Sequence, residues 1–214
     1  MSDTEFEVRI AWQRHIGTDA VADRWFDSVV ARYREPHRQY HDIRDLRWVV
    51  RHVEHLAADR RVDDLDAVIA AACFHDVIYV ATGHDNEVAS ARLAATALDD
   101  LGWDAGRIRH TVSMIEGTID HDHGEVGDDH RLLYAADLAV LAAAPAGYDD
   151  YARAVRREYH HVSAADWVTG RTAVLASFLA RPAIYAPSLR LDDWEQRARG
   201  NLTSELDRLR NATS

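Results

Sequence analysis

The chain has 214 residues, a formal net charge of −11 and 25 basic residues, all of which are arginine. An apolar fraction of 47% and a charged fraction of 29% are ordinary for a globular protein, and the length allows one domain, or two small ones, with a sizeable core. The chain is acidic and has no basic run, so duplex nucleic acid is not an expected partner. No apolar run approaches the roughly 20 residues that span a bilayer, so the membrane is not an expected partner either. With an acidic N-terminus that lacks a signal-peptide pattern, this predicts a cytoplasmic protein.

Helical periodicity dominates the first half of the chain. Apolar residues predict a first helix around 6–12, a second over 21–33, and a third that starts at Pro36 and runs to about Ala58. Residues 63–80 predict a fourth helix, and residues 86–101 predict a fifth that stops at Gly102. Asp104 is suited to cap the sixth helix.

The second half of the chain continues the pattern after a polar loop at 120–130. One helix is predicted over 131–143, and Pro145 terminates it. Further helices are predicted over 148–159, 164–179 and 192–209. No strand alternation, repeat or long linker is evident. The sequence therefore predicts an all-α single domain.

A histidine and an aspartate stand side by side at the end of a strongly apolar helical stretch. Residues 67–74 are almost wholly hydrophobic, and the stretch ends in FHDVIY, which contains His75 and Asp76. Burying a carboxylate costs several kcal/mol unless it is paired or bound to a cation. The chain has four His-Asp dipeptides, and this is the one that ends such a helix.

Asp137 is a second carboxylate in an apolar stretch, LLYAADLAVLAAA, with no basic residue next to it. A hydrogen bond to a tyrosine or tryptophan would explain it equally well. His37 and His41 lie four residues apart in EPHRQYHDIRDL and would share one helix face, although such pairs are more often surface or core residues. Combined, His41, His75, Asp76 and Asp137 form a nitrogen and oxygen donor set that suits a divalent transition metal.

The order His, His-Asp, Asp resembles the HD-domain superfamily of metal-dependent phosphohydrolases, which are all-helical. The resemblance runs from about Trp25 to Leu209 and is closest to a branch described as predicted metal-dependent HD phosphohydrolases. It is carried by EPHRQYHDIRDL, FHDVIY, DNEVASARLA, YAADLAVLA, YARAVRREY, GRTAVLASFLARPAIY and WEQRARGNL. The resemblance implies a single HD-domain-like bundle of about eight to nine helices over residues 1–214, with its core at about 25–209.

By this resemblance His41, His75, Asp76 and Asp137 match the metal-ligand positions for one divalent ion, which could be Mn, Fe, Co, Ni or Zn. HD proteins with two metals carry further histidines, and His110 and His121 lie in the right interval for a second ion. The loop at 120–130 is rich in His and Asp, and a solvated acidic loop is the alternative.

The expected reaction is cleavage of a phosphoester or phosphoanhydride in a small phosphorylated compound, such as a nucleotide, by water that the metal activates. Asp76 would both ligate the ion and orient the water. Glu87 is preferred over Asp85 as the general acid, because it opens the next helix and matches the NE segment of the family. Helix capping by residues 85–86 and a dipole role for Glu87 are the alternative.

Arginine and histidine side chains near the ligands are candidates for binding the substrate phosphate. We expect His37, Arg38 and His121 in this role, because a guanidinium matches phosphate geometry and the histidines can line the same cleft. Arg171, Arg197 and Arg199 are more readily explained as surface ion-pair partners. A non-catalytic metal or ligand sensor with the same core, and a purely structural helical protein, are the alternatives to an enzyme.

Overall fold

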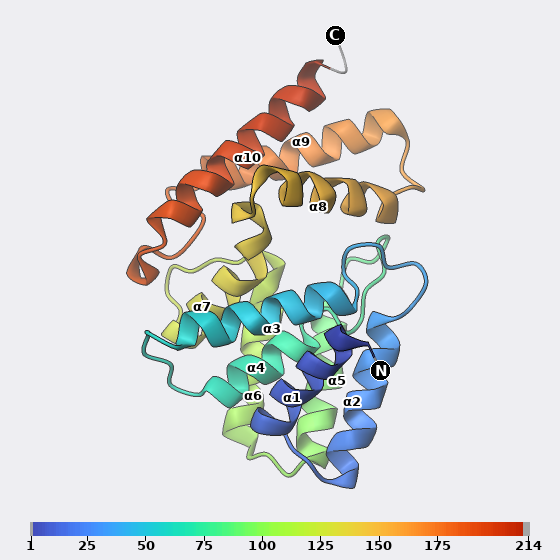
Figure 1. Ribbon diagram of the computed structural model, residues 1–214, viewed down its shortest axis with the longest axis vertical. Helices are drawn as coiled ribbons and strands as arrows, with labels where there is room; N and C mark the ends of the chain where they lie inside the picture. Colours follow the sequence, from blue (N-terminus) through green and yellow to red (C-terminus); the bar gives the residue numbers. More distant parts are fainter. Residues whose placement is uncertain (1, 212–214) are drawn as a thin grey trace. The chain divides into compact units, whose positions relative to one another are not determined.

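The computed structural model describes residues 2–211, and over this range the protein is helical throughout (Figure 1). The described part contains ten α-helices and three short 3-10 helices, and no strand. The all-α prediction is confirmed, whereas the expected count of about eight to nine helices was too low. Contacts divide the chain into two compact units, Met1–Asp137 and Leu138–Ser214. A single functional domain over residues 1–214 stays a prediction.

In the first unit, most of the other helices pack around one apolar helix, α4. The elements of this unit are α1 (Asp3–His15), α2 (Ala20–Tyr33), α3 (Ile43–Ala57), α4 (Leu65–Phe74), α5 (Asn86–Asp100), α6 (Ala105–Glu116), η1 (Gly117–Ile119) and α7 (Asp128–Asp137). Helix α4 contacts α1, α3, α5, α6 and α7. A helix that is apolar on every side has to be buried, and residues 67–74 of α4 are completely inaccessible to solvent.

Two helices are shorter than the periodicity predicts, and both differences affect the candidate site. Helix α3 begins at Ile43 and not at Pro36, because the Asp42 side chain accepts a hydrogen bond from the backbone N–H of Arg44 and caps the helix there. Helix α4 ends at Phe74, six residues before the predicted end. The segments 35–42 and 75–80 are therefore turns.

The second unit consists of η2 (Leu138–Ala142), α8 (Pro145–Glu158), α9 (Ala164–Ala180), η3 (Pro187–Leu189) and α10 (Asp192–Asn211). A buried ion pair joins its helices: the Arg171 guanidinium donates to both oxygens of Glu205 at 2.8 and 3.0 Å. Tyr148 donates a further hydrogen bond of 2.5 Å to Glu205. Arg171 is thus buried and not the expected surface partner, whereas Arg199 pairs with Glu195 one turn away on α10.

None of the helices described combines the length and the apolar character that a bilayer crossing requires.

Candidate metal centre

The four residues predicted as metal ligands come together within the first unit. His75 and Asp76 lie in the turn that follows α4, His41 lies just before α3, and Asp137 is the last residue of α7. The Nε2 atom of His75 is 3.4 Å from Asp76 Oδ2 and 3.5 Å from Asp137 Oδ1. His41 Nε2 is 3.9 Å from the same Asp76 oxygen. Three turns or helix ends that are distant in sequence therefore converge on one place.

The buried imidazole of His75 presents a free lone pair to this place. Its Nδ1 atom lies 2.9 Å from the carbonyl oxygen of Ala72. A carbonyl can only accept, so Nδ1 carries the proton and Nε2 of the neutral ring is bare. His75 is 1% exposed, and its Nε2 atom has no hydrogen-bond partner among the described residues. Metal-binding histidines commonly show this tautomer, with the ring nitrogen that does not bind the metal donating to a carbonyl oxygen.

A third carboxylate, from Asp45, belongs to the cluster and was missed by sequence reasoning. Asp45 lies in the first turn of α3 and is 5% exposed. One ligand atom each from Asp45, His75 and Asp76 lie within 4.8 Å of one another, and Asp45 Oδ1 is buried without a hydrogen-bond partner. The available signal was its place in the apolar stripe of α3, one turn before Val49 and two before Val53.

The pKa values in the cluster reflect concentrated negative charge in a buried place. Burial raises the pKa of Asp45 to about 7, against the opposing effect of His41 and His75. Burial also acts to raise the pKa of Asp137, but His75 and His121 outweigh it and lower this pKa to about 2. Burial acts to lower the pKa of His75, and the three neighbouring carboxylates reverse this and raise it. A bound cation would offset the negative charge of these carboxylates, which is otherwise offset by the neighbouring histidines.

His121 reaches the cluster, whereas His110 does not. The Nε2 atom of His121 is 2.7 Å from Asp137 Oδ2, so the loop at 120–130 is connected to the ligands. The His121 backbone adopts a left-handed conformation with φ of 50°. His110 instead lies 2.9 Å from Asp129, a buried carboxylate that accepts the backbone N–H groups of Asp63 and Asp64 and so fixes the start of α4.

The donor atoms suit a divalent transition metal in type and spacing. Two ligand atoms that each lie about 2.1 Å from a tetrahedral ion are about 3.4 Å apart. The two distances from His75 Nε2, 3.4 and 3.5 Å, agree with this value. Imidazole nitrogens together with carboxylate oxygens are the ligands of many divalent metal sites. The residues present therefore fit a metal ion.

Arg38 is directed at the backbone and not at open space. Its side chain is fully buried, and its guanidinium donates to the carbonyl oxygens of His41, Asp76 and Val77. The guanidinium of Arg38 is therefore engaged by the backbone and is not presented to a phosphate. The His37 ring remains about half exposed, with Nε2 at 2.9 Å from the carbonyl oxygen of Tyr79.

The first turn of α5 is tied to the turn that carries the ligands. Asn86 bonds both backbone groups of Val80, and the Ser90 hydroxyl bonds both backbone groups of Ile78. Glu87 lies between these two anchors and is half-buried. Asp85 precedes the helix, but its side chain makes no capping hydrogen bond, so the capping alternative is wrong for this residue.

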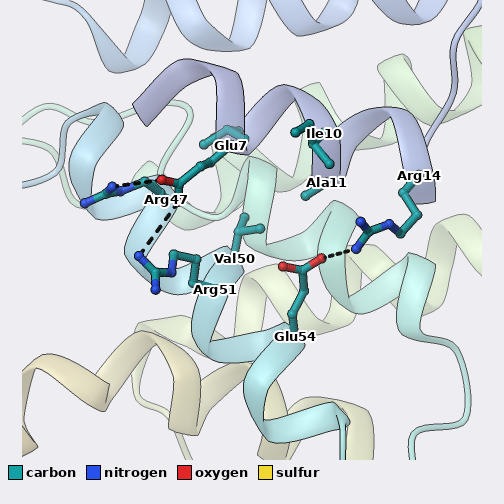
Figure 2. A pocket seen from close by; sticks show the side chains of 9 residues that line it. Glu7, Ile10, Ala11, Arg14, Arg47, Val50, Arg51 and Glu54 are labelled. Atoms are coloured by element: carbon teal, nitrogen blue, oxygen red, sulfur yellow. Dashed lines mark hydrogen bonds and ion pairs between the residues drawn. The ribbon is translucent and has the colours of Figure 1, made fainter. Parts of the chain in front are cut away.

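A separate cavity of about 340 Å³ lies between α1 and α3 (Figure 2). Its charged side chains are paired with one another: Arg14 with Glu54 at 2.9 Å, and Glu7 with both Arg47 and Arg51. At 100° per residue, the α3 positions that line it face away from Asp45. This cavity is therefore distinct from the candidate metal centre.

No protein-family model, no curated protein and no solved structure matches the chain. The chemistry of the centre is accordingly the basis for assigning a function.

Proposed function

We propose that the protein is a metal-dependent phosphohydrolase of the HD type that acts on a small phosphorylated compound. His41, His75, Asp76 and Asp137 would hold one divalent ion, and Asp45 is an additional ligand candidate. The observation that carries the proposal is the buried Nε2 atom of His75, which makes no hydrogen bond and faces the carboxylates of Asp76 and Asp137 at 3.4 and 3.5 Å. Without a metal, a neutral ring would leave this buried nitrogen without a hydrogen bond, at a cost of roughly 1–3 kcal/mol, and a protonated ring would be a buried charge that these two carboxylates have to offset.

A divalent ion in such a centre lowers the pKa of water and offsets the charge on phosphoryl oxygens. The protein residues have complementary tasks. His121 orients Asp137 through their 2.7 Å contact. Glu87, held beside the ligand turn by its neighbours Asn86 and Ser90, is the candidate proton donor to the leaving oxygen. His37, with a half-exposed ring at the same turn, is the candidate for contact with the substrate.

A metal-binding sensor without catalysis is the second candidate. One observation favours it: in the described structure the Glu87 side chain makes no hydrogen bond or ion pair, so nothing fixes its carboxyl group toward the ligands. A sensor and an enzyme would share the metal centre, so metal binding supports both. Turnover of a phosphorylated compound distinguishes them.

The first experiment measures metal content per chain by elemental analysis after loading with Mn²⁺, Co²⁺ or Zn²⁺. We expect about one tightly held ion in the wild type and its loss in Asp137→Ala, because that variant removes a charged ligand. Asp129→Asn is the matched control, since Asp129 is also a buried carboxylate next to a histidine. Full metal content in Asp137→Ala would show that the ligand set is wrong.

The second experiment screens the metal-loaded wild type against nucleotides, sugar phosphates and nitrophenyl phosphates, with the apoprotein as the blank. Metal-dependent release of phosphate or of a nucleoside supports the enzyme. A wild type that binds the ion and cleaves none of these compounds would favour the sensor.

A further inference from the structure

The two turns that carry three of the ligands have no helical hydrogen-bond ladder of their own. Residues 35–42 contain His41, and residues 75–80 contain His75 and Asp76. Catalytic and ligand-binding geometry has to be held to within roughly 0.5 Å to be effective. Some interaction between the two turns must therefore set the separation of their ligands.

Arg38 makes this connection. One guanidinium nitrogen, Nη1, donates to the carbonyl oxygen of His41 at 3.0 Å and to that of Asp76 at 2.7 Å. The other terminal nitrogen, Nη2, donates to the carbonyl oxygen of Val77 at 3.0 Å. A single side chain thus bridges the backbones of two candidate ligands that belong to different turns.

The surroundings of Arg38 restrict its movement. The guanidinium lies over the ring of Tyr33, 5.0 Å from its centroid, and over the ring of Tyr79 at 5.6 Å. Both tyrosines also contact the ligands: the Tyr33 hydroxyl accepts from the backbone N–H of Asp76, and the Tyr79 ring stacks on the ring of His41 at 4.2 Å. Arg38 is therefore packed between groups that themselves touch the ligand residues.

The chemistry requires a guanidinium at this position. Three carbonyl oxygens in different directions match the fixed, planar set of donors in arginine, whereas the ammonium of lysine is a single point of donation on a flexible stem. Glu35 Oε2 lies 3.5 Å from Arg38 Nε and supplies a nearby opposite charge. A buried cation is costly unless it is paired and hydrogen-bonded. Here Glu35 supplies the opposite charge and both terminal nitrogens of Arg38 donate hydrogen bonds, whereas Nε makes none among the described residues.

We infer that Arg38 is a positioning residue of the metal centre: it fixes the distance between His41 and Asp76 and thereby the coordination geometry. This inference rests on the proposed metal-dependent function. In this role Arg38 positions the metal-ligating residues and does not bind the substrate phosphate. Partners of this kind that orient metal ligands typically contribute a factor of about 10 to 100 in metal affinity.

The test compares full-length wild type, Arg38→Lys and Arg107→Lys, each loaded with Co²⁺ as the probe. Arg107 is the matched control because it also stacks on an aromatic ring, that of Trp103 at 3.9 Å, and donates to several oxygens within the same unit. Its partners are Asp64 and Asp66, which are not candidate ligands. The readouts are the melting temperature, the Co²⁺ dissociation constant and the visible absorption spectrum of bound Co²⁺.

We expect both variants to melt at lower temperature, and only Arg38→Lys to weaken Co²⁺ binding, by about 10- to 100-fold, with a changed absorption spectrum. Arg38→Met is the second variant; it keeps an unbranched apolar side chain between the tyrosines and removes all donors. It should bind Co²⁺ no better than Arg38→Lys.

Two failures can be told apart. If the wild type itself binds no Co²⁺, the proposed function is wrong. If the wild type binds Co²⁺ and Arg38→Lys keeps the same affinity and spectrum, the positioning role is wrong. Arg38 variants that stay unfolded even with excess Co²⁺ would also overturn it, because Arg38 would then serve the fold and not the metal geometry.

Discussion

Glu87 is the candidate general acid of the proposed enzyme. It lies in the first turn of α5, between Asn86 and Ser90, whose side chains bond the turn after α4. A carboxyl group there is near the candidate ligands without being one of them. Its effect on turnover can therefore be separated from its effect on metal content.

Glu87→Gln keeps the size of the side chain and removes its acid. Metal content should be unchanged, and turnover of a substrate with a poor leaving group should fall by roughly 10² to 10⁴, the usual contribution of positioned acid–base catalysis. Nitrophenyl phosphates need less protonation of the leaving group and should lose less activity. Steady-state kinetics on both substrate types measures the difference.

Glu116→Gln is the control for this experiment, since Glu116 is an exposed carboxylate at the end of α6. Equal losses on both substrate types in Glu87→Gln would point to substrate positioning or to folding. Unchanged turnover of both would remove Glu87 from the mechanism and direct attention to His121.

At the scale of elements, two of the candidate ligands lie at the C-terminal ends of α-helices. His75 is the C-cap of α4, and Asp137 is the last residue of α7. The C-terminal end of a helix carries partial negative charge, so a carboxylate at this end is unfavourable and a cation is favourable. The positions of the helix ends thus add to the case for a positive ion in the centre.

The helices of the second unit depend on a buried ion pair. The side chain of Arg171 in α9 and that of Glu205 in α10 are 7% and 8% exposed, so water does not screen them appreciably. Glu205→Gln leaves the Arg171 charge without its partner, and we expect a loss of about 3–5 kcal/mol in the free energy of unfolding. Hydrogen exchange should show the loss of protection in α8, α9 and α10.

A conservative change on the surface is the control for this prediction. Arg208 in α10 pairs with Asp149 in α8 with its side chain 54% exposed, so Arg208→Gln should change stability by less than about 1 kcal/mol. Similar losses of unfolding free energy in the two variants would mean that the buried pair stabilises the protein no more than an exposed pair does.

For the whole molecule, metal removal is the broadest test of the centre. All the candidate ligands belong to the unit Met1–Asp137, and none belongs to Leu138–Ser214. An ion that binds only the folded state stabilises it by about 2.7 kcal/mol at a concentration of one hundred times the dissociation constant. Chelation should therefore lower the melting temperature, by roughly 2–4 °C per kcal/mol for a chain of this length.

Hydrogen exchange with and without chelator locates this effect. We expect faster exchange in the turns at 35–42 and 75–80 and at the end of α7, and little change in α9 and α10. Equal acceleration in both units, or no shift in melting after complete metal removal, would contradict a metal centre confined to the first unit.

The helical character of the chain and the location of most helices follow from local sequence, because periodicity and capping act over a few neighbouring residues. The caps at Asp104 and at the end of α5 before Gly102 follow from such local chemistry. The need of His75 and Asp137 for a partner was equally predictable, since polar residues in apolar stretches require one, whereas the end of α7 at Asp137 was not, because the helix was expected to continue to residue 143.

Which side chains meet depends on how the helices and turns pack against one another. Residue spacing identifies the face of a helix but not the helix that packs against it, so the inclusion of Asp45, the contact of His121 with Asp137 and the separate role of His110 could not be derived from the sequence. The contacts of Arg38 could not be derived from the sequence for the same reason. Whether an arginine meets solvent or three backbone carbonyls depends on the fold of a turn distant in sequence, and no local pattern encodes that.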